Sequence, residues 1–418
     1  MMNRTSGILP MPFALRLLTL AALLFTAGCS WFSWIPGIGE KEDDLLEPAE
    51  LVKFKAEVDV ETEWKRGIGD GLGRKYLRLR PLVLADRIYA ADGYGYVAAF
   101  DRYNGKKVWD KRVDKIERGF LSSLNFMDRR DRSFVGGLGT GAGMVFVGTT
   151  TGFVVALSAS DGEERWRTNV QGEVLAASTA EEGLVFTQTI DGRLIALKED
   201  SGEQVWSFRN PVPVLTLRGT ASPVYSAGAV ITGFASGKVS AIRASNGEPV
   251  WEQRVMLPEG RSELERIVDV DGTPLISTGN VYVASFQGRV KALRQRDGSQ
   301  IWEREISSFL DLTEGYSQVY VVAEDDTITA FDRDTGEIAW TQEGLKRRKL
   351  TAPLAFSNYL LVGDDDGYLH VLAQSDGRFI GRRKLDGKGL RSGMTVAEST
   401  VYVLGNSGKL SAIKIEER

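Results

Sequence analysis

Few side chains in this sequence are suited to chemistry, since its 418 residues include one cysteine, Cys29, and one histidine, His370. A transition-metal site needs several such ligands, so the composition argues against one. His370 lies in the predicted strand 368–372, where a structural role is favoured over a catalytic one. The acidic run Asp364-Asp365-Asp366-Gly367 lacks the later glutamate of an EF-hand, and we expect it to form a hairpin turn rather than a calcium site. No metal or other cofactor is therefore expected.

Two further patterns resemble binding loops but have simpler interpretations. Five glycines between Gly136 and Gly143 lack the lysine and the serine or threonine that complete a phosphate-binding loop, so we interpret them as strand and turn glycines. The basic run Lys346-Arg347-Arg348-Lys349 is expected to lie on a solvated loop between repeats. With 43% hydrophobic residues and a net charge of −4, the chain has the composition of a globular protein, and nothing indicates a nucleic-acid partner.

Cys29 stands directly after an apolar segment, which gives its thiol a specific chemistry. Residues 17–27 are too few to span a bilayer and are typical of a signal-peptide core. Together with Thr26-Ala27-Gly28, Cys29 resembles the lipobox of bacterial lipoproteins, whose cysteine is acylated and becomes the new N-terminus. The resemblance implies a signal peptide over residues 1–28 and a lipid anchor on Cys29.

The residues after the cysteine extend this prediction. Ser30 follows Cys29, where inner-membrane lipoproteins carry an aspartate, so the resemblance implies the outer membrane. Residues 29–56 contain prolines, glycines and an acidic cluster, and they are predicted to form the lipidated end and a flexible tether.

A spaced triplet organises the rest of the chain: a glycine, a second glycine ten residues later, and a tryptophan four residues after that. It is complete at Gly95/Gly105/Trp109, Gly152/Gly162/Trp166, Gly192/Gly202/Trp206, Gly237/Gly247/Trp251 and Gly288/Gly298/Trp302. Altered copies follow at Asp326/Gly336/Trp340 and Gly367/Gly377/Gly381, and another begins at Gly408. Short apolar runs flank turns in which glycine supplies a positive φ. Four antiparallel strands per repeat are typical of propeller blades.

The two ends of the repeat array are expected to meet. The lone predicted strand 57–68 carries Trp64 one repeat period before Trp109, and we expect it to pair with the last copy, 400–415. This pairing would close an all-β, eight-bladed propeller over residues 57–418 and hide its ends. The repeat tryptophans are expected to be core residues: Trp64, Trp109, Trp166, Trp206, Trp251, Trp302 and Trp340. Because Gly381 replaces the eighth, its blade is expected to pack differently.

The window 99–109, with the sequence AFDRYNGKKVW, resembles the tryptophan-docking motif of pyrroloquinoline-quinone-type propellers. That superfamily contains quinoprotein dehydrogenases and non-enzymatic assembly lipoproteins. The dehydrogenases carry an adjacent cysteine pair, which is missing from this sequence. The resemblance therefore favours the second class. A quinoprotein dehydrogenase-like enzyme and a general envelope adaptor for sugars or peptidoglycan stay as alternatives.

Two segments between blades contain residues that the repeat does not require, Val214-Leu215-Thr216-Leu217-Arg218-Gly219 and residues 263–271. They resemble the corresponding segments of the BamB family, lipoproteins of the outer-membrane β-barrel assembly machinery. The resemblance implies that a periplasmic domain of the barrel-inserting subunit BamA is bound by Leu215, Leu217, Arg218, Asp269 and Asp271. Loops of adjacent blades emerge on one rim, so we expect the two segments to be neighbours. Alternatively, the leucines pack under the blade and the aspartates cap turns.

Taken together, the anchor and the resemblance imply a non-enzymatic scaffold lipoprotein on the periplasmic side of the outer membrane of a Gram-negative bacterium. BamA is the partner that the resemblance implies, and the lipid anchor adds the outer membrane itself. Direct contact with unfolded outer-membrane proteins is a further hypothesis.

Overall fold

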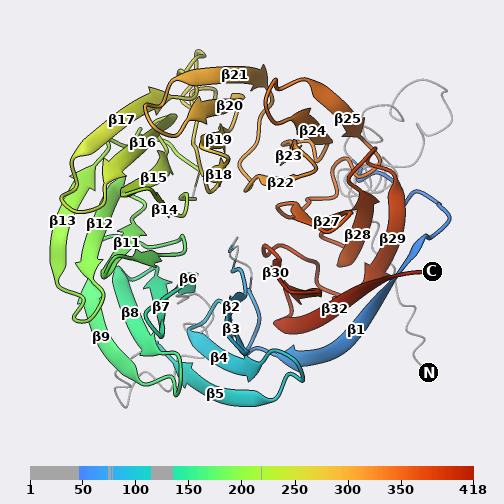
Figure 1. Cartoon of the computed structure of the whole chain (residues 1–418), viewed down its shortest axis with the longest axis horizontal. Coiled ribbons are helices and arrows are strands. Elements are labelled where there is room, and N and C mark those ends of the chain that lie inside the picture. Colours follow the sequence, from blue (N-terminus) through green and yellow to red (C-terminus); the bar gives the residue numbers. More distant parts are fainter. Residues whose placement is uncertain (1–46, 74–76, 78, 114–134, 218) are drawn as a thin grey trace, which may run out of the picture. The chain divides into compact units, whose positions relative to one another are not determined.

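The computed structural model of this protein describes residues 47–73, 77, 79–113, 135–217 and 219–418. Residues 48–418 form one compact unit, in which eight four-stranded antiparallel sheets follow one another around a ring (Figure 1). This arrangement confirms the predicted eight-bladed β-propeller. Every named strand pairs within its own sheet of this unit, so the unit is self-contained.

We number the blades from the N-terminal side of the ring. Blade 1 contains β2 (Leu82–Leu84), β3 (Arg87–Ala91), β4 (Tyr96–Asp101) and β5 (Lys107–Arg112); blade 2 contains β6 (Val135–Gly141), β7 (Met144–Thr149), β8 (Phe153–Ser158) and β9 (Glu164–Asn169). Blade 3 contains β10 (Thr179–Glu181), β11 (Leu184–Gln188), β12 (Arg193–Lys198) and β13 (Gln204–Arg209); blade 4 contains β14 (Val224–Ser226), β15 (Ala229–Phe234), β16 (Lys238–Arg243) and β17 (Pro249–Arg254).

The second half of the ring repeats this order. Blade 5 contains β18 (Leu275–Ser277), β19 (Asn280–Ala284), β20 (Arg289–Arg294) and β21 (Gln300–Glu305); blade 6 contains β22 (Thr313–Gly315), β23 (Gln318–Val322), β24 (Ile328–Asp332) and β25 (Ile338–Gln342). Blade 7 contains β26 (Leu354–Phe356), β27 (Tyr359–Gly363), β28 (Tyr368–Ala373) and β29 (Phe379–Lys384); blade 8 contains β30 (Thr395–Ala397), β31 (Thr400–Leu404), β32 (Lys409–Glu417) and β1 (Val58–Gly67).

The repeat tryptophans join each blade to the next. Trp109 lies in the outermost strand of blade 1, and its indole Nε1 donates a hydrogen bond of 3.0 Å to the carbonyl oxygen of Ala159 in blade 2. The indole ring covers Gly162, where a Cβ atom would lie 2.6 Å from the ring. All seven repeat tryptophans are buried and make this bond to the following blade. The second glycine of the triplet is therefore needed both for its positive φ and for the space above it.

Blade 8 closes the ring with strands from both ends of the chain. β1 pairs antiparallel with β32, with Trp64 opposite Ala412. In blade 7, Gly381 takes the register position that tryptophan has elsewhere, and a Cβ atom there would lie 2.6 Å from Cγ2 of Val58 in β1. The incoming strand thus fills the space of the missing indole, which confirms that this blade packs differently. Blade 8 also has no turn between its two outer strands on which an indole could dock, because β32 and β1 are far apart in sequence.

The glycine-rich stretch after residue 135 is strand and turn, as expected. β6 runs along the connector that follows blade 2, and a Cβ atom on Gly139 would lie 1.8 Å from the carbonyl oxygen of Ser178. Gly143 has a φ of 74° in the turn between β6 and β7. These glycines allow close backbone contact and do not form a loop around a ligand.

Two sequence-based expectations are wrong. The tether was expected to extend through residue 56, but residues 48–56 lie against blade 7: the backbone N–H of Ala49 donates to the Lys346 carbonyl, and Phe54 stacks on Phe379 at 5.8 Å. Arg348 was expected on a solvated loop, yet it is buried and forms ion pairs with Asp364 at 2.7 Å and Asp366 at 2.5 Å.

His370 is part of the same buried cluster and has a structural role there. Arg382 Nε donates to His370 Nδ1 at 3.1 Å, so His370 Nε2 carries the proton and donates to Asp364 Oδ2 at 2.9 Å. Burial lowers the pKa of His370, which keeps the ring neutral. Asp364, Asp365 and Asp366 form the expected hairpin turn between β27 and β28, and Asp364 is fully committed to protein partners.

Candidate functional site

The described segments that link one blade to the next lie on one face of the ring. In every blade the outermost strand runs in the same direction, and its end leads to the innermost strand of the following blade. We call this the connector face. Two of its segments, the 210–223 connector between blades 3 and 4 and the 255–274 connector between blades 4 and 5, carry the predicted contact residues.

The two connectors are direct neighbours, as the sequence predicted. The backbone N–H of Leu217 donates a hydrogen bond of 2.5 Å to Oδ2 of Asp269. A Cβ atom on Gly219 would lie 2.3 Å from Oδ2 of Asp271, so the first connector passes directly over the second aspartate. Both aspartates are buried. They hold the 210–223 connector in place from below and do not themselves form an exposed surface.

Asp269 has an unusual electrostatic environment. Its Oδ1 atom is buried, and no hydrogen-bond partner for it occurs in the described part of the chain. Burial, and to a lesser degree the charge of Asp271, raises the pKa of Asp269 to about 8, although the Leu217 N–H opposes the shift. The raised pKa favours the protonated form of the carboxyl group, and no cation among the described residues is paired with it beneath the connector.

Both connectors carry exposed apolar side chains. Leu215 is 42% exposed and Val214 is 91% exposed on the first connector, and Leu257 and Leu264 are 55% and 66% exposed on the second. We call these four residues the apolar rim patch. Leu217 is only partly buried beside them. Large apolar side chains on adjoining loops, exposed in the free protein, are typical of the centre of a protein-protein contact.

The second connector is folded tightly enough to present its leucine in one place. Ser262 and Glu265 form a reciprocal capping box: the Glu265 N–H donates to Ser262 Oγ at 3.3 Å, and the Ser262 N–H donates to Glu265 Oε2 at 3.2 Å. Gln287 Nε2 donates to the carbonyl oxygen of Leu264 at 3.1 Å. A preorganised surface loses less conformational entropy when a partner binds.

The structure places only some of the residues predicted for this site. It brings together Leu215, Leu217, Asp269 and Asp271, whereas Arg218 lies outside the described residues, as does Cys29. Sequence reasoning did not single out Val214, Leu257 and Leu264. The available signal was that each is an apolar residue outside the strand pattern of the repeat.

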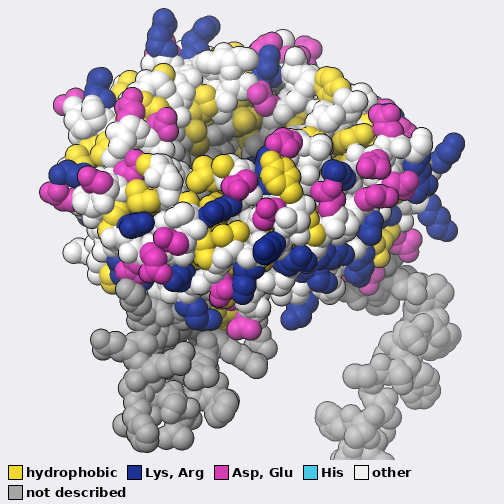
Figure 2. All heavy atoms as spheres, turned by 60° about the horizontal axis from the view of Figure 1, so that its bottom comes forward, with side chains coloured by type: hydrophobic (Ala, Val, Ile, Leu, Met, Phe, Trp, Pro, Cys, Tyr) yellow, Lys and Arg dark blue, Asp and Glu magenta, His cyan; other side chains and the backbone are white. Residues whose placement is uncertain are grey.

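The described residues give little support for other kinds of functional site. These ranges hold no group of three or more histidine, cysteine, aspartate or glutamate side chains suited to a metal ion. Nor does any helix within them have the length and apolar character needed to cross a membrane. On most of the outer wall that Figure 2 shows, apart from its lower front, acidic and basic side chains are interspersed, and the centre of the ring is hollowed.

Comparisons with known proteins agree with this fold and surface. Residues 93–342 match the family model described as outer membrane protein assembly factor BamB. The protein of that name from Pseudomonas aeruginosa is 41% identical over 396 residues, covering 95% of this chain and 97% of the relative. The one from Escherichia coli is 34% identical over 402 residues, covering 96% and 99%.

Solved structures give the same result at the level of the fold. The crystal structure of BamB from Moraxella catarrhalis superposes with a TM-score of 0.75 at 28% identity, covering 85% of this chain and 100% of that one. Quinohemoprotein alcohol dehydrogenase from Comamonas testosteroni reaches a TM-score of 0.65 at 15% identity over 85% of this chain and 76% of its own, which reflects the shared propeller alone. The chain belongs to the BamB family of outer membrane protein assembly factors.

Proposed function

We propose that this chain is a non-enzymatic scaffold of outer-membrane protein assembly that docks on the periplasmic domains of BamA through the apolar rim patch. The observation that carries the proposal is the pairing of exposed apolar side chains with a buried support. The Leu215 side chain is exposed, while the backbone N–H of Leu217 donates a hydrogen bond to Asp269. An apolar centre on a rigid backbone is what a protein partner requires.

The described charges supply a polar border to this patch. Arg266 and Glu263 form an ion pair of 3.7 Å next to Leu264, and both side chains are exposed. Polar groups around an apolar centre exclude water from it and orient the partner. Leucines at the centre then supply most of the binding free energy, and the border supplies specificity.

Anchoring is the second part of the proposal. Acylation of Cys29 and removal of residues 1–28 would hold the propeller on the periplasmic side of the outer membrane. Residues 29–47 would then be the tether, shorter than expected because the folded unit begins at Pro48. The scaffold would thereby be kept near BamA, and a tethered partner binds at a high effective concentration.

Affinity purification of the full chain from membranes, followed by identification of the bound proteins, tests this function. Recovery of BamA would support it. The enzyme alternative instead predicts a bound chromophore and dye reduction with alcohols after addition of pyrroloquinoline quinone and calcium. The adaptor alternative predicts retention on peptidoglycan without BamA, and either result would overturn the proposed function.

A further inference from the structure

A group of positively charged side chains lies where the ring closes, across the ring from the apolar rim patch. Lys65 at the end of β1, Arg383 at the end of β29 and Lys409 at the start of β32 are exposed, and Lys388 follows in the connector between blades 7 and 8. We call these four residues the basic corner. The Lys388 carbonyl accepts a hydrogen bond from Asn406, whose neighbour Ser407 lines a shallow pocket of about 320 Å³ with Lys65 and Lys409.

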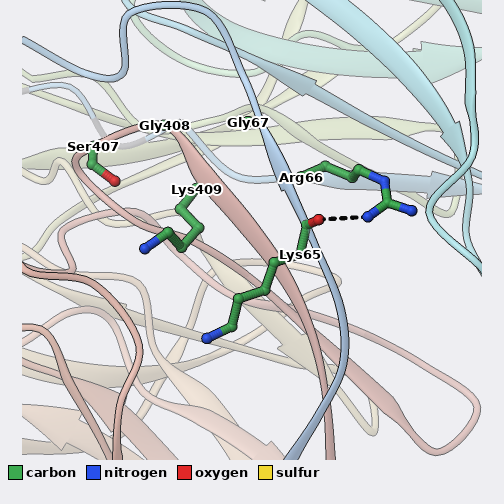
Figure 3. Close-up of a pocket in the computed structure, with 6 residues that line it drawn as sticks. All are labelled: Lys65, Arg66, Gly67, Ser407, Gly408 and Lys409. Carbon is green, nitrogen blue, oxygen red and sulfur yellow. Dashed lines mark hydrogen bonds between the residues drawn. The ribbon is translucent and has the colours of Figure 1, made fainter.

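Two lysines of the basic corner, Lys65 and Lys409, extend in the same direction. Figure 3 shows the amino groups of Lys65 and Lys409 extending to the same side of β1, whereas Arg66 points away and is held by the carbonyl oxygens of Lys65, Asn104 and Gly105. In Figure 2, lysine and arginine side chains gather on the lower front of the ring, toward the side where Figure 1 shows β1 and β5.

No carboxylate in the described part of the chain neutralises these cations, in contrast to several lysines of the other blades. Four such lysines are paired: Lys107 with Asp110 at 2.7 Å, Lys111 with Glu163 at 2.5 Å, Lys198 with Glu203 at 2.5 Å and Lys291 with Glu303 at 3.0 Å. In the described part of the chain, none of the four basic-corner side chains forms an ion pair. Burial, followed by the charges of Lys409 and Arg383, lowers the pKa of Lys65, and no acidic group offsets this effect.

Strand β1 separates the two signs of charge along its length. Its first six residues include the exposed Asp59 and Glu63, which pair with Arg418 at 2.6 Å and Lys414 at 2.6 Å. Its last four residues include Lys65 and Arg66, and the strand ends at the connector face. The basic corner is therefore confined to the connector face of blades 7 and 8, in a chain whose net charge is −4.

The chain also enters the folded unit at this face. The Ala49 N–H donates to the carbonyl oxygen of Lys346, and Arg348 Nη1 donates to the Ala49 carbonyl, both in the connector between blades 6 and 7. Residues 29–47 precede this point, and a flexible segment of that length has an r.m.s. span of about 25 Å. A lipid anchor on Cys29 would therefore keep the connector face of blades 7 and 8 within a few tens of ångströms of a bilayer.

We propose that the basic corner binds the anionic phospholipid surface of the membrane to which the chain is anchored. This inference rests on the anchor in the proposed function. Contact at the basic corner determines the orientation of the ring on the membrane. Blades 7 and 8 then lie against the lipid, and blades 3 to 5, on the opposite side of the ring, lie away from it. The apolar rim patch stays accessible to BamA. Attraction of this kind reaches only about 8 Å at physiological ionic strength, so the short tether is a necessary part of it.

Vesicle binding by the unit 48–418, which lacks the anchor, tests the proposal. We expect binding to vesicles that contain phosphatidylglycerol and none to vesicles of phosphatidylcholine alone, with a steep loss as salt is raised. Lys65→Glu/Lys409→Glu should lower the partition coefficient by at least about 25-fold, since each lysine near an anionic surface contributes about fivefold. The matched control is Lys106→Glu/Arg165→Glu, which makes the same charge change at the starts of the outer strands of blades 1 and 2, on the opposite face.

Each outcome decides the question. Equal losses in the two double variants, or no binding of the unsubstituted unit, would overturn the proposal, and so would displacement by inorganic phosphate at matched ionic strength. Retention on an immobilised acidic peptide without vesicle binding would assign the basic corner to a protein partner instead. BamA binding by the same variants is measured in parallel. A loss of vesicle binding with BamA binding unchanged separates this inference from the proposed function.

Discussion

Replacing Gly381 by alanine tests how the ring closes. The new methyl group would lie 2.6 Å from Cγ2 of Val58, whereas carbon atoms in van der Waals contact are about 3.5 to 4.0 Å apart. Val58 is buried in β1, and the N–H of the preceding Glu57 donates to the Ile380 carbonyl beside it, so the strand has little room to move away. We expect a loss of about 1–3 kcal/mol in the free energy of unfolding, the usual cost of overpacking by one carbon.

A second substitution separates this clash from other effects. Val58→Ala alone should cost about 1–2 kcal/mol, because two buried methyl groups are removed. In the double variant the smaller side chain makes room for the new methyl group, so the two costs should not add, with a coupling energy of about 1–2 kcal/mol. Gly67→Ala is the control in β1, the strand of Val58, since nothing lies within 4 Å of the Cβ position of Gly67, and it should leave stability unchanged.

Denaturant unfolding of the four variants, with hydrogen exchange of the β1 amides, provides the measurement. Gly381→Ala should speed exchange in β1 before other strands, because the clash pushes the closing strand away from blade 7 and lowers the free energy of its local opening. Equal stability of Gly381→Ala and Gly67→Ala, or strictly additive costs in the double variant, would refute the idea that Val58 occupies the place of the missing tryptophan.

Three further predictions follow from individual side chains. Trp302→Ala should cost roughly 3–5 kcal/mol in denaturant unfolding, whereas Trp302→Phe, which loses mainly the 2.9 Å hydrogen bond to Arg333, should cost much less; equal costs would contradict the docking role. The pKa of Asp269 is raised from 3.8 to about 8 on folding, so its contribution to stability is complete below pH 3.8 and is lost as the pH rises to about 8. Asp269→Asn should remove that part of the pH dependence, and identical pH profiles would argue against a protonated carboxyl group. Cys29→Ser should release the protein from the membrane fraction, and its persistence there would argue against acylation.

The ring was predictable because each element of the repeat has one dominant physical reason. Glycine with positive φ marks the turns, and a tryptophan that must dock on the next blade marks the outer strand, as Trp109 does on Gly162. Trp64 lies one repeat period before Trp109, so closure of the ring through β1 could also be predicted. Neighbouring connectors could be predicted from the direction of the strands alone.

Features outside the repeat could not be predicted in the same way. Arg348 belongs to a basic run that is typical of a solvated loop, and its burial depends on Asp364 and Asp366, which only the fold brings beneath it. Residues 48–56 have a linker composition, but Phe54 finds an aromatic partner on β29. The sequence left open whether Asp269 faces a partner or supports the chain, and its bond to Leu217 shows the supporting role.

The affinity of the propeller for the purified periplasmic domains of BamA tests the central claim most directly, with Leu215→Asp compared with Val205→Asp. Both side chains are similarly exposed, at 42% and 44%, but Leu215 is in the apolar rim patch and Val205 is on the outer wall of β13. Neither change should affect folding. We predict that Leu215→Asp weakens binding by about 30-fold or more, as loss of a central contact of about 2 kcal/mol would, while Val205→Asp binds like the unsubstituted protein. Equal affinity of the two variants would contradict docking through the connectors of blades 3 to 5.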